Sequence, residues 1–439
     1  MSWHRHEMLF GYLGAVIAGF LLTAVPNWTG RLPIAGGQLA SLALLWVTAR
    51  AAMFFSASTG AAIAALLDVG FLLVLALVCA REVLIARNRN VPVVGAVLLL
   101  ALASAADHAE AAQLLASDGA GWRAGFAIVL LLIALIGGRI IPSFTANWLI
   151  KQGQARLPRQ PSTFDFATIG VTAVGLGCWV FGVAAGWGAA LLIGAGLLQI
   201  VRLARWQGLR TTADPLVFIL HLSYAWLPLG LVLLGMSLLV PTQPTSSALH
   251  AMAAGAMASM TLAVMTRATL GHTGRKLHAD FGTTCIYLLV TLGAATRVAA
   301  PWLPFDYMLS IQLSGALWAV RSCCSWSCTV PSSLDRDPTA SRDRGRAAQG
   351  AARCQSCLTS TMESRSRPSA TQPFALGAVG SARPFAPIRS SSPVQPRSRP
   401  SFSAASSSAA RPGAAWLNSK VTKSSSASTS PWRIRSPRR

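Results

Sequence analysis

The sequence predicts an all-α protein, a polytopic bundle of transmembrane helices followed by a disordered C-terminal tail. Of its 439 residues, 53 % are hydrophobic and only 12 % are charged, whereas about a quarter of the residues in a soluble domain are charged. The hydrophobic residues gather in successive runs of about 17 to 25 residues, which is the length of a helix that spans a bilayer core. This pattern continues to Val320 and stops at Arg321.

Short polar connections separate eleven apolar runs, of which the last is incomplete. None of them has the short core and small-residue cleavage site of a secretory signal. We therefore expect the first run to be retained as a span. The expected spans cover residues 8–25, 36–57, 60–80, 91–106, 121–142, 165–185, 187–203, 214–240, 246–268 and 281–299, with the incomplete run beginning at 305.

The charge of the connections predicts the orientation of the bundle. Basic residues fall in every second connection, and the connections between them are nearly neutral or acidic. By the positive-inside rule the basic connections are cytoplasmic. The stretch at residues 3–8, Trp-His-Arg-His-Glu-Met, then lies on the outer side of the membrane.

The sequence after residue 320 is a mixture of Ser, Arg, Pro and Ala without an apolar period. Residues 321–439 hold 19 basic and 4 acidic residues, against 18 and 10 in residues 1–320, so most of the net charge of +23 lies in this tail. The change interrupts an apolar helix, which would leave unsatisfied backbone groups in a bilayer. We therefore expect a transmembrane bundle over residues 1–320 and a disordered basic tail over 321–439, and we hypothesise that a frameshift near codon 320 produced the tail. The alternative is an arm that binds nucleic acid or anionic lipid, although we expect no nucleic-acid partner.

All seven histidines lie in the first 280 residues, among apolar segments where an imidazole needs a ligand, a partner or water. The expected outer helix ends carry His4, His6, His108 and His250, whereas His221 and His272 lie toward the cytoplasmic side, so two separate metal sites are conceivable. His4 and His6 point to the same side only if the chain is extended there. The alternative for this pair is an interfacial Trp and His anchor at the lipid headgroups.

Two oppositely charged residues lie within neighbouring spans. Arg50 is about seven residues from the outer end of its span and Asp68 about eight from the outer start of the next, so a tight hairpin brings them to one depth. This spacing predicts an intramembrane ion pair. We expect a structural pair that fixes two helices, and the alternative is part of a proton or ion path.

Glycine adjoins arginine at two expected cytoplasmic helix ends, in residues 137–139 and 271–275. Glycine lets a backbone approach a cofactor closely, and the planar guanidinium suits a carboxylate or propionate group. The alternative is a glycine-rich helix end with a snorkelling arginine. Neither segment has Walker or Rossmann spacing, and the sequence contains no recognisable catalytic motif.

Several stretches together carry a family resemblance: residues 3–8, 18–24, 27–30, 137–147, 250–257 and 265–275, with His221, Tyr224 and Trp226. At these residues the chain resembles the NnrS family, haem- and copper-containing bacterial membrane proteins linked to nitric oxide and denitrification. This resemblance implies a bundle of about twelve transmembrane helices in the bacterial inner membrane that binds haem b and copper. Family members usually have a hydrophobic helix before the stretch at residues 3–8, so we expect that helix to be missing here.

The resemblance implies a haem- and copper-binding protein of the nitric oxide response or denitrification, with a redox role through these groups left open. The alternative is a proton-coupled or small-solute transporter in which Arg50, Asp68 and the histidines line a pathway. We expect contact with membrane lipid, and the sequence does not determine the oligomeric state. The expected metal ligands are His4, His6 and His250 at an outer site and His221 and His272 at an inner one, with Arg139 and Arg275 as candidate propionate partners.

Overall fold

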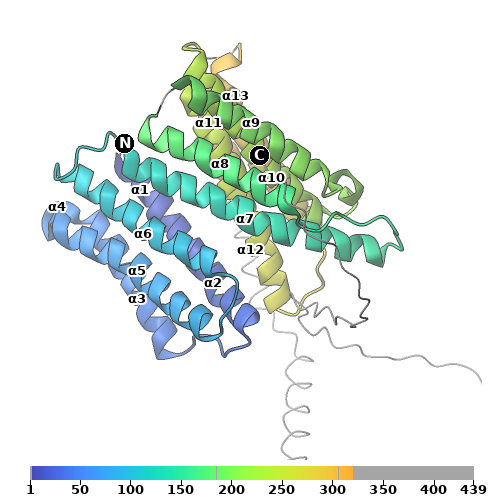
Figure 1. Ribbon diagram of the computed structural model, residues 1–439, viewed down its shortest axis with the longest axis horizontal. Helices are drawn as coiled ribbons and strands as arrows, with labels where there is room; N and C mark the ends of the chain where they lie inside the picture. The colour runs from blue at the N-terminus through green and yellow to red at the C-terminus, as the bar shows by residue number, and fades with distance from the viewer. Residues whose placement is uncertain (1, 184, 305, 320–439) are drawn as a thin grey trace, which may run out of the picture. The chain divides into compact units, whose positions relative to one another are not determined.

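The computed structural model describes residues 2–183, 185–304 and 306–319, and every regular element within these ranges is a helix (Figure 1). The predicted tail, residues 321–439, lies outside them. The helices are α1 (Ser2–His6), η1 (Glu7–Tyr12), α2 (Leu13–Thr29), α3 (Gly37–Phe54), α4 (Ser56–Thr59), α5 (Ala61–Ile85), α6 (Val91–Ala111), α7 (Ala120–Lys151), α8 (Thr163–Phe181), α9 (Ala185–Ala204), η2 (Gly208–Thr211), α10 (Pro215–Leu239), α11 (Thr245–His250), η3 (Ala251–Ala258), α12 (Ser259–His272), α13 (Phe281–Ala299) and η4 (Ala300–Trp302).

The predicted fold class is confirmed. Within the described residues, ten helices are long and apolar enough to cross a membrane, and each coincides with one of the ten complete spans expected from the sequence. The incomplete run beginning at 305 is helical over residues 307–319. The chain is therefore an all-α, multi-pass membrane protein.

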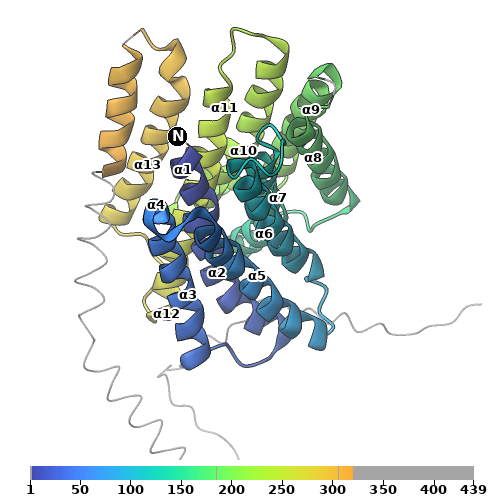
Figure 2. The ribbon, with the colours of Figure 1, turned by 90° about the vertical axis from the view of Figure 1, so that its left-hand side faces the viewer.

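Consecutive helices pack against each other because their connections are short. In the N-terminal half α2 and α3 pack on α5, α5 packs on α6, and α6 packs on α7. In the C-terminal half α7 packs on α8, α8 on α9, and α9 on α10, which also contacts the continuous helix formed by α11, η3 and α12 (Figure 2). The long helix α7 therefore belongs to both halves.

The apolar side chains are arranged as a bilayer requires. A buried core includes Leu72, Leu100 and Leu220, each fully covered. Leu66 and Leu77 on α5 are 73 % and 66 % exposed, an arrangement that would be unfavourable in water. Because lipid surrounds a membrane-spanning helix, these outward leucines contribute contacts with acyl chains.

Several helices extend further than the sequence pattern predicted, and two of these extensions concern candidate residues. The span expected to end at residue 106 continues as α6 to Ala111, through the polar residues Asp107 and His108. The span expected to end at 142 continues as α7 to Lys151, with Pro142 inside the helix. The additional turn of α6 brings polar side chains to the candidate site described next.

Candidate metal centre

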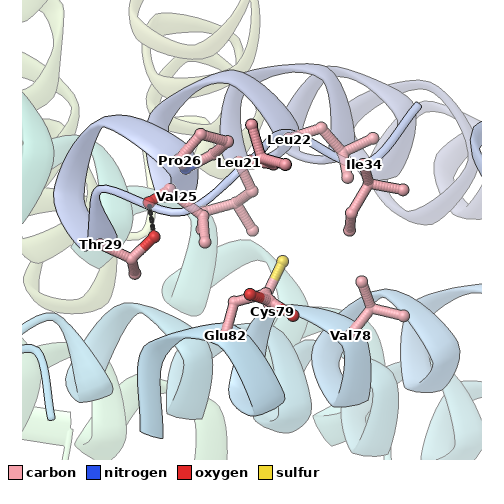
Figure 3. Close-up of a pocket in the computed structure, with 10 residues that line it drawn as sticks. Leu21, Leu22, Val25, Pro26, Thr29, Ile34, Val78, Cys79 and Glu82 are labelled. Atoms are coloured by element: carbon pink, nitrogen blue, oxygen red, sulfur yellow. Dashed lines mark hydrogen bonds between the residues drawn. The ribbon is translucent and has the colours of Figure 1, made fainter. Parts of the chain in front are cut away.

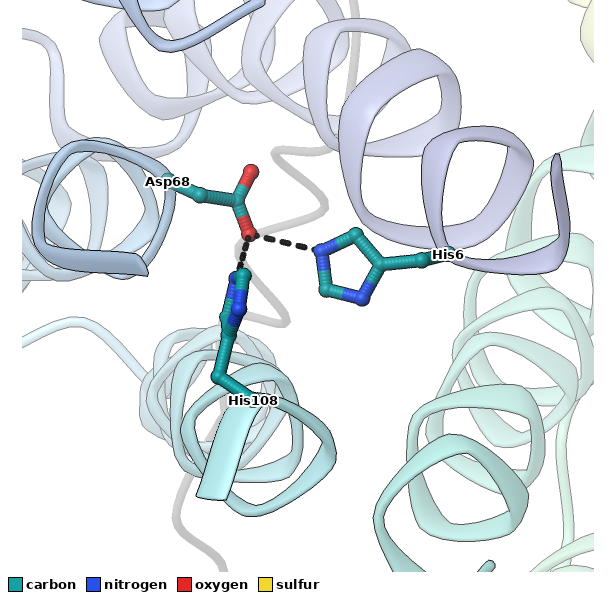
Figure 4. Close-up of side chains that lie close together, drawn as sticks. All are labelled: His6, Asp68 and His108. Atoms are coloured by element: carbon teal, nitrogen blue, oxygen red, sulfur yellow. Dashed lines mark hydrogen bonds and ion pairs between the residues drawn. The ribbon is translucent and has the colours of Figure 1, made fainter. Parts of the chain in front are cut away.

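A buried cluster of two histidines and an aspartate lies at one end of the N-terminal half. His6 comes from α1, Asp68 from α5 and His108 from α6, and one ligand atom from each lies within 4.8 Å of the others. Figure 4 shows one carboxylate oxygen of Asp68 facing both imidazole rings. That oxygen, Oδ2, lies 3.0 Å from His6 Nε2 and 3.3 Å from His108 Nε2. Among the described residues no other group of three or more His, Cys, Asp and Glu side chains is arranged this way.

The stretch at residues 3–8 is helical, which separates its two histidines. His6 is 5 % exposed and points into the bundle, whereas His4 is exposed. Side chains two residues apart on a helix point in nearly opposite directions. The extended chain needed for joint chelation by His4 and His6 is therefore not formed, because α1, η1 and α2 run on as one helix.

Both ring nitrogens of His6 face carboxylate oxygens. Nδ1 lies 2.7 Å from Asp107 Oδ2, and Nε2 lies 3.0 Å from Asp68 Oδ2. A doubly protonated ring donates to both carboxylates. A neutral ring that donates Nδ1–H to Asp107 instead directs the Nε2 lone pair toward Asp68, an arrangement that a bridging cation makes favourable.

Asp68 is held by further donors besides the histidines. The Ser104 hydroxyl donates to Oδ2 at 2.8 Å. Arg50 forms an ion pair with the other oxygen, Oδ1, and donates from Nη1 to Glu7 Oε1 at 2.6 Å. The structure thus pairs Arg50 with Asp68 through Oδ1, while Oδ2 accepts from Ser104 and faces the two histidines.

The sequence interpretation missed Ser104, Asp107 and His108 as site residues. They lie at i, i+3 and i+4 on α6, so they share one helix face. The signal was present, but a span expected to end at residue 106 placed Asp107 and His108 in the connection. Glu7, in the first turn of η1, was missed as the second partner of Arg50 for a similar reason, because this stretch was expected to lie outside the helix.

Of the two histidines predicted for the inner site, the structure describes the side chain of His221. His221 is buried on α10, with Nε2 2.8 Å from the Thr145 hydroxyl and Nδ1 without a hydrogen-bond partner. A Cβ placed on Gly208 would lie 2.5 Å from Nδ1, so backbone covers that nitrogen closely. The ring presents no open nitrogen to a haem iron in this arrangement. The side chain of His272 lies outside the described residues.

The remaining predicted residues lie apart from the metal cluster. His250 is half-buried at the end of α11 and is not a member of the His6–Asp68–His108 group. Arg275 is exposed in the connection after α12. Arg139 on α7 donates from Nη1 to Asn90 Oδ1 at 2.5 Å.

The glycines beside Arg139 accommodate protein side chains. A Cβ on Gly138 would collide with the guanidinium of Arg202, and one on Gly137 would lie 3.2 Å from the Tyr224 ring. Arg202 donates from Nε to Asp165 Oδ1 at 3.0 Å and from Nη1 to the Tyr224 hydroxyl at 2.9 Å. The space beside Gly137 and Gly138, where the sequence suggested the close approach of a cofactor, is therefore occupied by Tyr224 and Arg202 of this buried polar network.

A separate pocket lies between α2 and α5 (Figure 3). Its cavity volume is about 10 Å³, and its walls are mostly apolar, including Leu21, Val25 and Val78. Thr29, Cys79 and Glu82 are its polar or thiol side chains, and it has no histidine. This pocket is not part of the metal cluster.

The family model of the NnrS protein matches residues 1–329, which is most of the chain. No curated protein and no solved structure matches the chain. The matched region includes every residue of the candidate metal centre. The chain therefore belongs to the NnrS family.

Proposed function

We propose that this protein binds copper and haem in the bacterial inner membrane and acts in the nitric oxide response or denitrification. The observation that supports the copper site is the buried group of His6, Asp68 and His108, with ligand atoms within 4.8 Å of one another. The cofactors and the biological role come from the resemblance to the NnrS family.

The donor set suits a transition metal. Neutral imidazole is a good ligand for copper, zinc, iron and nickel, and Cu(II) binds such sites more tightly than the other divalent ions of the series. Two imidazoles with one carboxylate leave a coordination position for a small molecule. Bound copper would supply a redox-active centre and a position for nitric oxide or another small ligand.

The protein groups around the donors prepare them for a cation. Asp107 accepts from His6 Nδ1 at 2.7 Å, which fixes the ring and leaves Nε2 as the ligand atom. Glu7, Asp68 and Asp107 bring three carboxylates, whereas Arg50 and the partly exposed Arg5, 3.7 Å from Asp107, bring two guanidinium groups. The excess of carboxylate favours the binding of a metal cation or a proton.

The haem part of the proposal is supported by the family resemblance alone. The described residues do not fit haem at His221, because Thr145 and the backbone of Gly208 enclose its ring. We therefore assign no step and no residue to haem. An absorption spectrum of the purified protein tests this part: a Soret band supports haem, and its absence contradicts it.

Copper titration of histidine variants tests the metal centre. The protein, purified with an affinity tag that contains no histidine, is expected to bind one Cu(II) tightly. His6→Ala and His108→Ala are expected to bind Cu(II) much more weakly, whereas His4→Ala, two residues from His6 on the exposed side of α1, is the matched control and should retain tight binding. Equal losses in His4→Ala and His6→Ala would refute the site. His250→Ala tests whether the fourth expected outer histidine contributes.

A transporter is the second candidate function. It is supported by a chain of contacts that runs from buried Asp68 through His6 to Asp107 and the partly exposed Arg5. We propose that this end of the bundle faces the periplasm, as the loop charges predict. A preparation that binds neither copper nor haem but moves protons across reconstituted vesicles would favour the transporter over the metalloprotein.

A further inference from the structure

The helix that carries His6 contains a π-helical turn immediately after this residue. η1 spans Glu7–Tyr12, and its end is marked by the Leu13 N–H, which donates to the carbonyl five residues back, at Met8. A π-turn contains one residue more than an α-turn, and such turns often lie at functional sites. In this protein the turn directly follows His6 in the chain, and side chains of α3 contact it.

Two side chains of α3 approach this turn at Gly11. A Cβ on Gly11 would collide with the Arg50 guanidinium and would lie 2.8 Å from Glu7 Oε2. The Trp46 indole N–H donates to the Gly11 carbonyl at 3.0 Å. Since Trp46 and Arg50 are four residues apart on α3, they lie on one helix face and contact the same glycine.

These contacts determine how Arg50 reaches the cluster. Its guanidinium crosses the space above Gly11, donates to Glu7 on one side and pairs with Asp68 Oδ1 on the other. Asp68 Oδ2 is then left for His6 and His108. A side chain at position 11 would displace the guanidinium and allow the carboxylate of Asp68 to rotate away from the histidines.

We propose that Gly11 and Trp46 are positioning residues of the metal centre, which hold Arg50 so that Asp68 presents one oxygen to a metal bound by His6 and His108. This inference rests on the proposed copper site. Both residues contact Arg50 or the turn beside it, and both act on Asp68 through Arg50.

Affinity for Cu(II) in Gly11→Ala and Gly19→Ala tests the inference. Gly19 is the matched control, because it lies on the same continuous helix and a Cβ there would meet nothing within 4 Å. Gly11→Ala is expected to bind Cu(II) about 10–100-fold more weakly, the range seen for groups that orient metal ligands, with a changed Cu(II) electron paramagnetic resonance spectrum. Gly19→Ala should keep the wild-type affinity and spectrum. Equal affinity and spectrum in the two variants would overturn the inference.

Trp46→Phe provides a second variant should Gly11→Ala not fold. This substitution removes the indole N–H that donates to the Gly11 carbonyl. We expect Trp46→Phe, like Gly11→Ala, to bind Cu(II) more weakly than the wild type. Wild-type affinity in Trp46→Phe would overturn the proposal. A second measurement on the metal-free protein distinguishes failure of the positioning role from failure of the copper site. In it, the modification of His6 by diethyl pyrocarbonate is mapped by mass spectrometry. Gly11→Ala is expected to increase this modification relative to Gly19→Ala, and no increase would overturn the positioning role even if copper did not bind.

Discussion

Gly138 allows the sharpest test of packing in this bundle. It lies on α7 where the Arg202 guanidinium occupies the space of a side chain, so Gly138→Ala forces one methyl group against a charge that is 2 % exposed. Gly194 on α9 is the matched control, because a Cβ there would meet nothing within 4 Å. The two variants make the same chemical change within a helix.

The expected effects have opposite signs. Replacing glycine by alanine in a helix stabilises by about 0.5–1 kcal/mol when the space is free, which is the result expected for Gly194→Ala. At Gly138 overpacking costs about 1–3 kcal/mol. If Arg202 also loses Asp165, to which Nε donates at 3.0 Å, breaking the buried pair costs about 3–5 kcal/mol. The net destabilisation, overpacking and lost pair together minus the gain in helix stability, is then about 3–7 kcal/mol.

Thermal unfolding in detergent, followed by size-exclusion chromatography after heating, measures the difference. Gly138→Ala should unfold at a lower temperature than the wild type, and Gly194→Ala at the same or a higher temperature. If Gly138→Ala is as stable as Gly194→Ala and instead loses a bound cofactor, the glycines at 137 and 138 serve the cofactor as the sequence suggested, and our account of Arg202 is wrong.

Three further predictions concern other parts of the chain. Asp68 is 1 % exposed, and Asp68→Asn removes its charge, which faces Arg50 and two histidines. This change should destabilise the protein by about 3–5 kcal/mol. Asp118→Asn, at an exposed position, is the control, and equal melting temperatures of the two variants would contradict the prediction. Asp280 caps α13 by accepting from the Thr283 N–H at 2.7 Å, and hydrogen bonds from Thr283 hold the pKa of this carboxyl below its ordinary value. The ionised cap therefore stabilises the fold at pH values above the ordinary carboxyl pKa, and this stabilisation is lost as the pH falls through the lowered pKa of Asp280. Asp280→Ala should lower the free energy of unfolding by about 1 kcal/mol at pH 7 and by less in acid. Melting scans across pH measure this, and a loss of stability that is the same at every pH would refute it. The gene read in another frame after codon 320 should continue the apolar helix of residues 307–319, and nucleotide sequence without such a continuation in either other frame would refute the frameshift hypothesis.

The spans could be predicted from the sequence because a bilayer imposes a length and a composition on each helix. Their ends could not, since polar residues at a helix end resemble a connection. At the end of α6 this error left Asp107 in the connection and kept His108, although it was placed at an outer helix end, out of the expected ligands; at residues 3–8 it placed outside the span a stretch that is helical in the structure.

The pairing of Arg50 with Asp68 was accessible from spacing, because a short connection joins α3 to α5 and brings equal depths together. The approach of His6 to His108 was not, because α1 and α6 are far apart in the chain and their contact depends on how the bundle closes. For the same reason the sequence could not show that Arg202 packs on Gly138, because α9 contributes this side chain from a distant part of the chain.

The central claim is that His6 and His108 bind one metal ion together. Electron spin-echo envelope modulation of the Cu(II)-loaded protein measures this most directly, because it detects the remote nitrogens of coordinated imidazoles. The account predicts signals from two imidazoles in the wild type and from one in His108→Ala loaded at excess copper. Signals that persist unchanged in both His6→Ala and His108→Ala would contradict it.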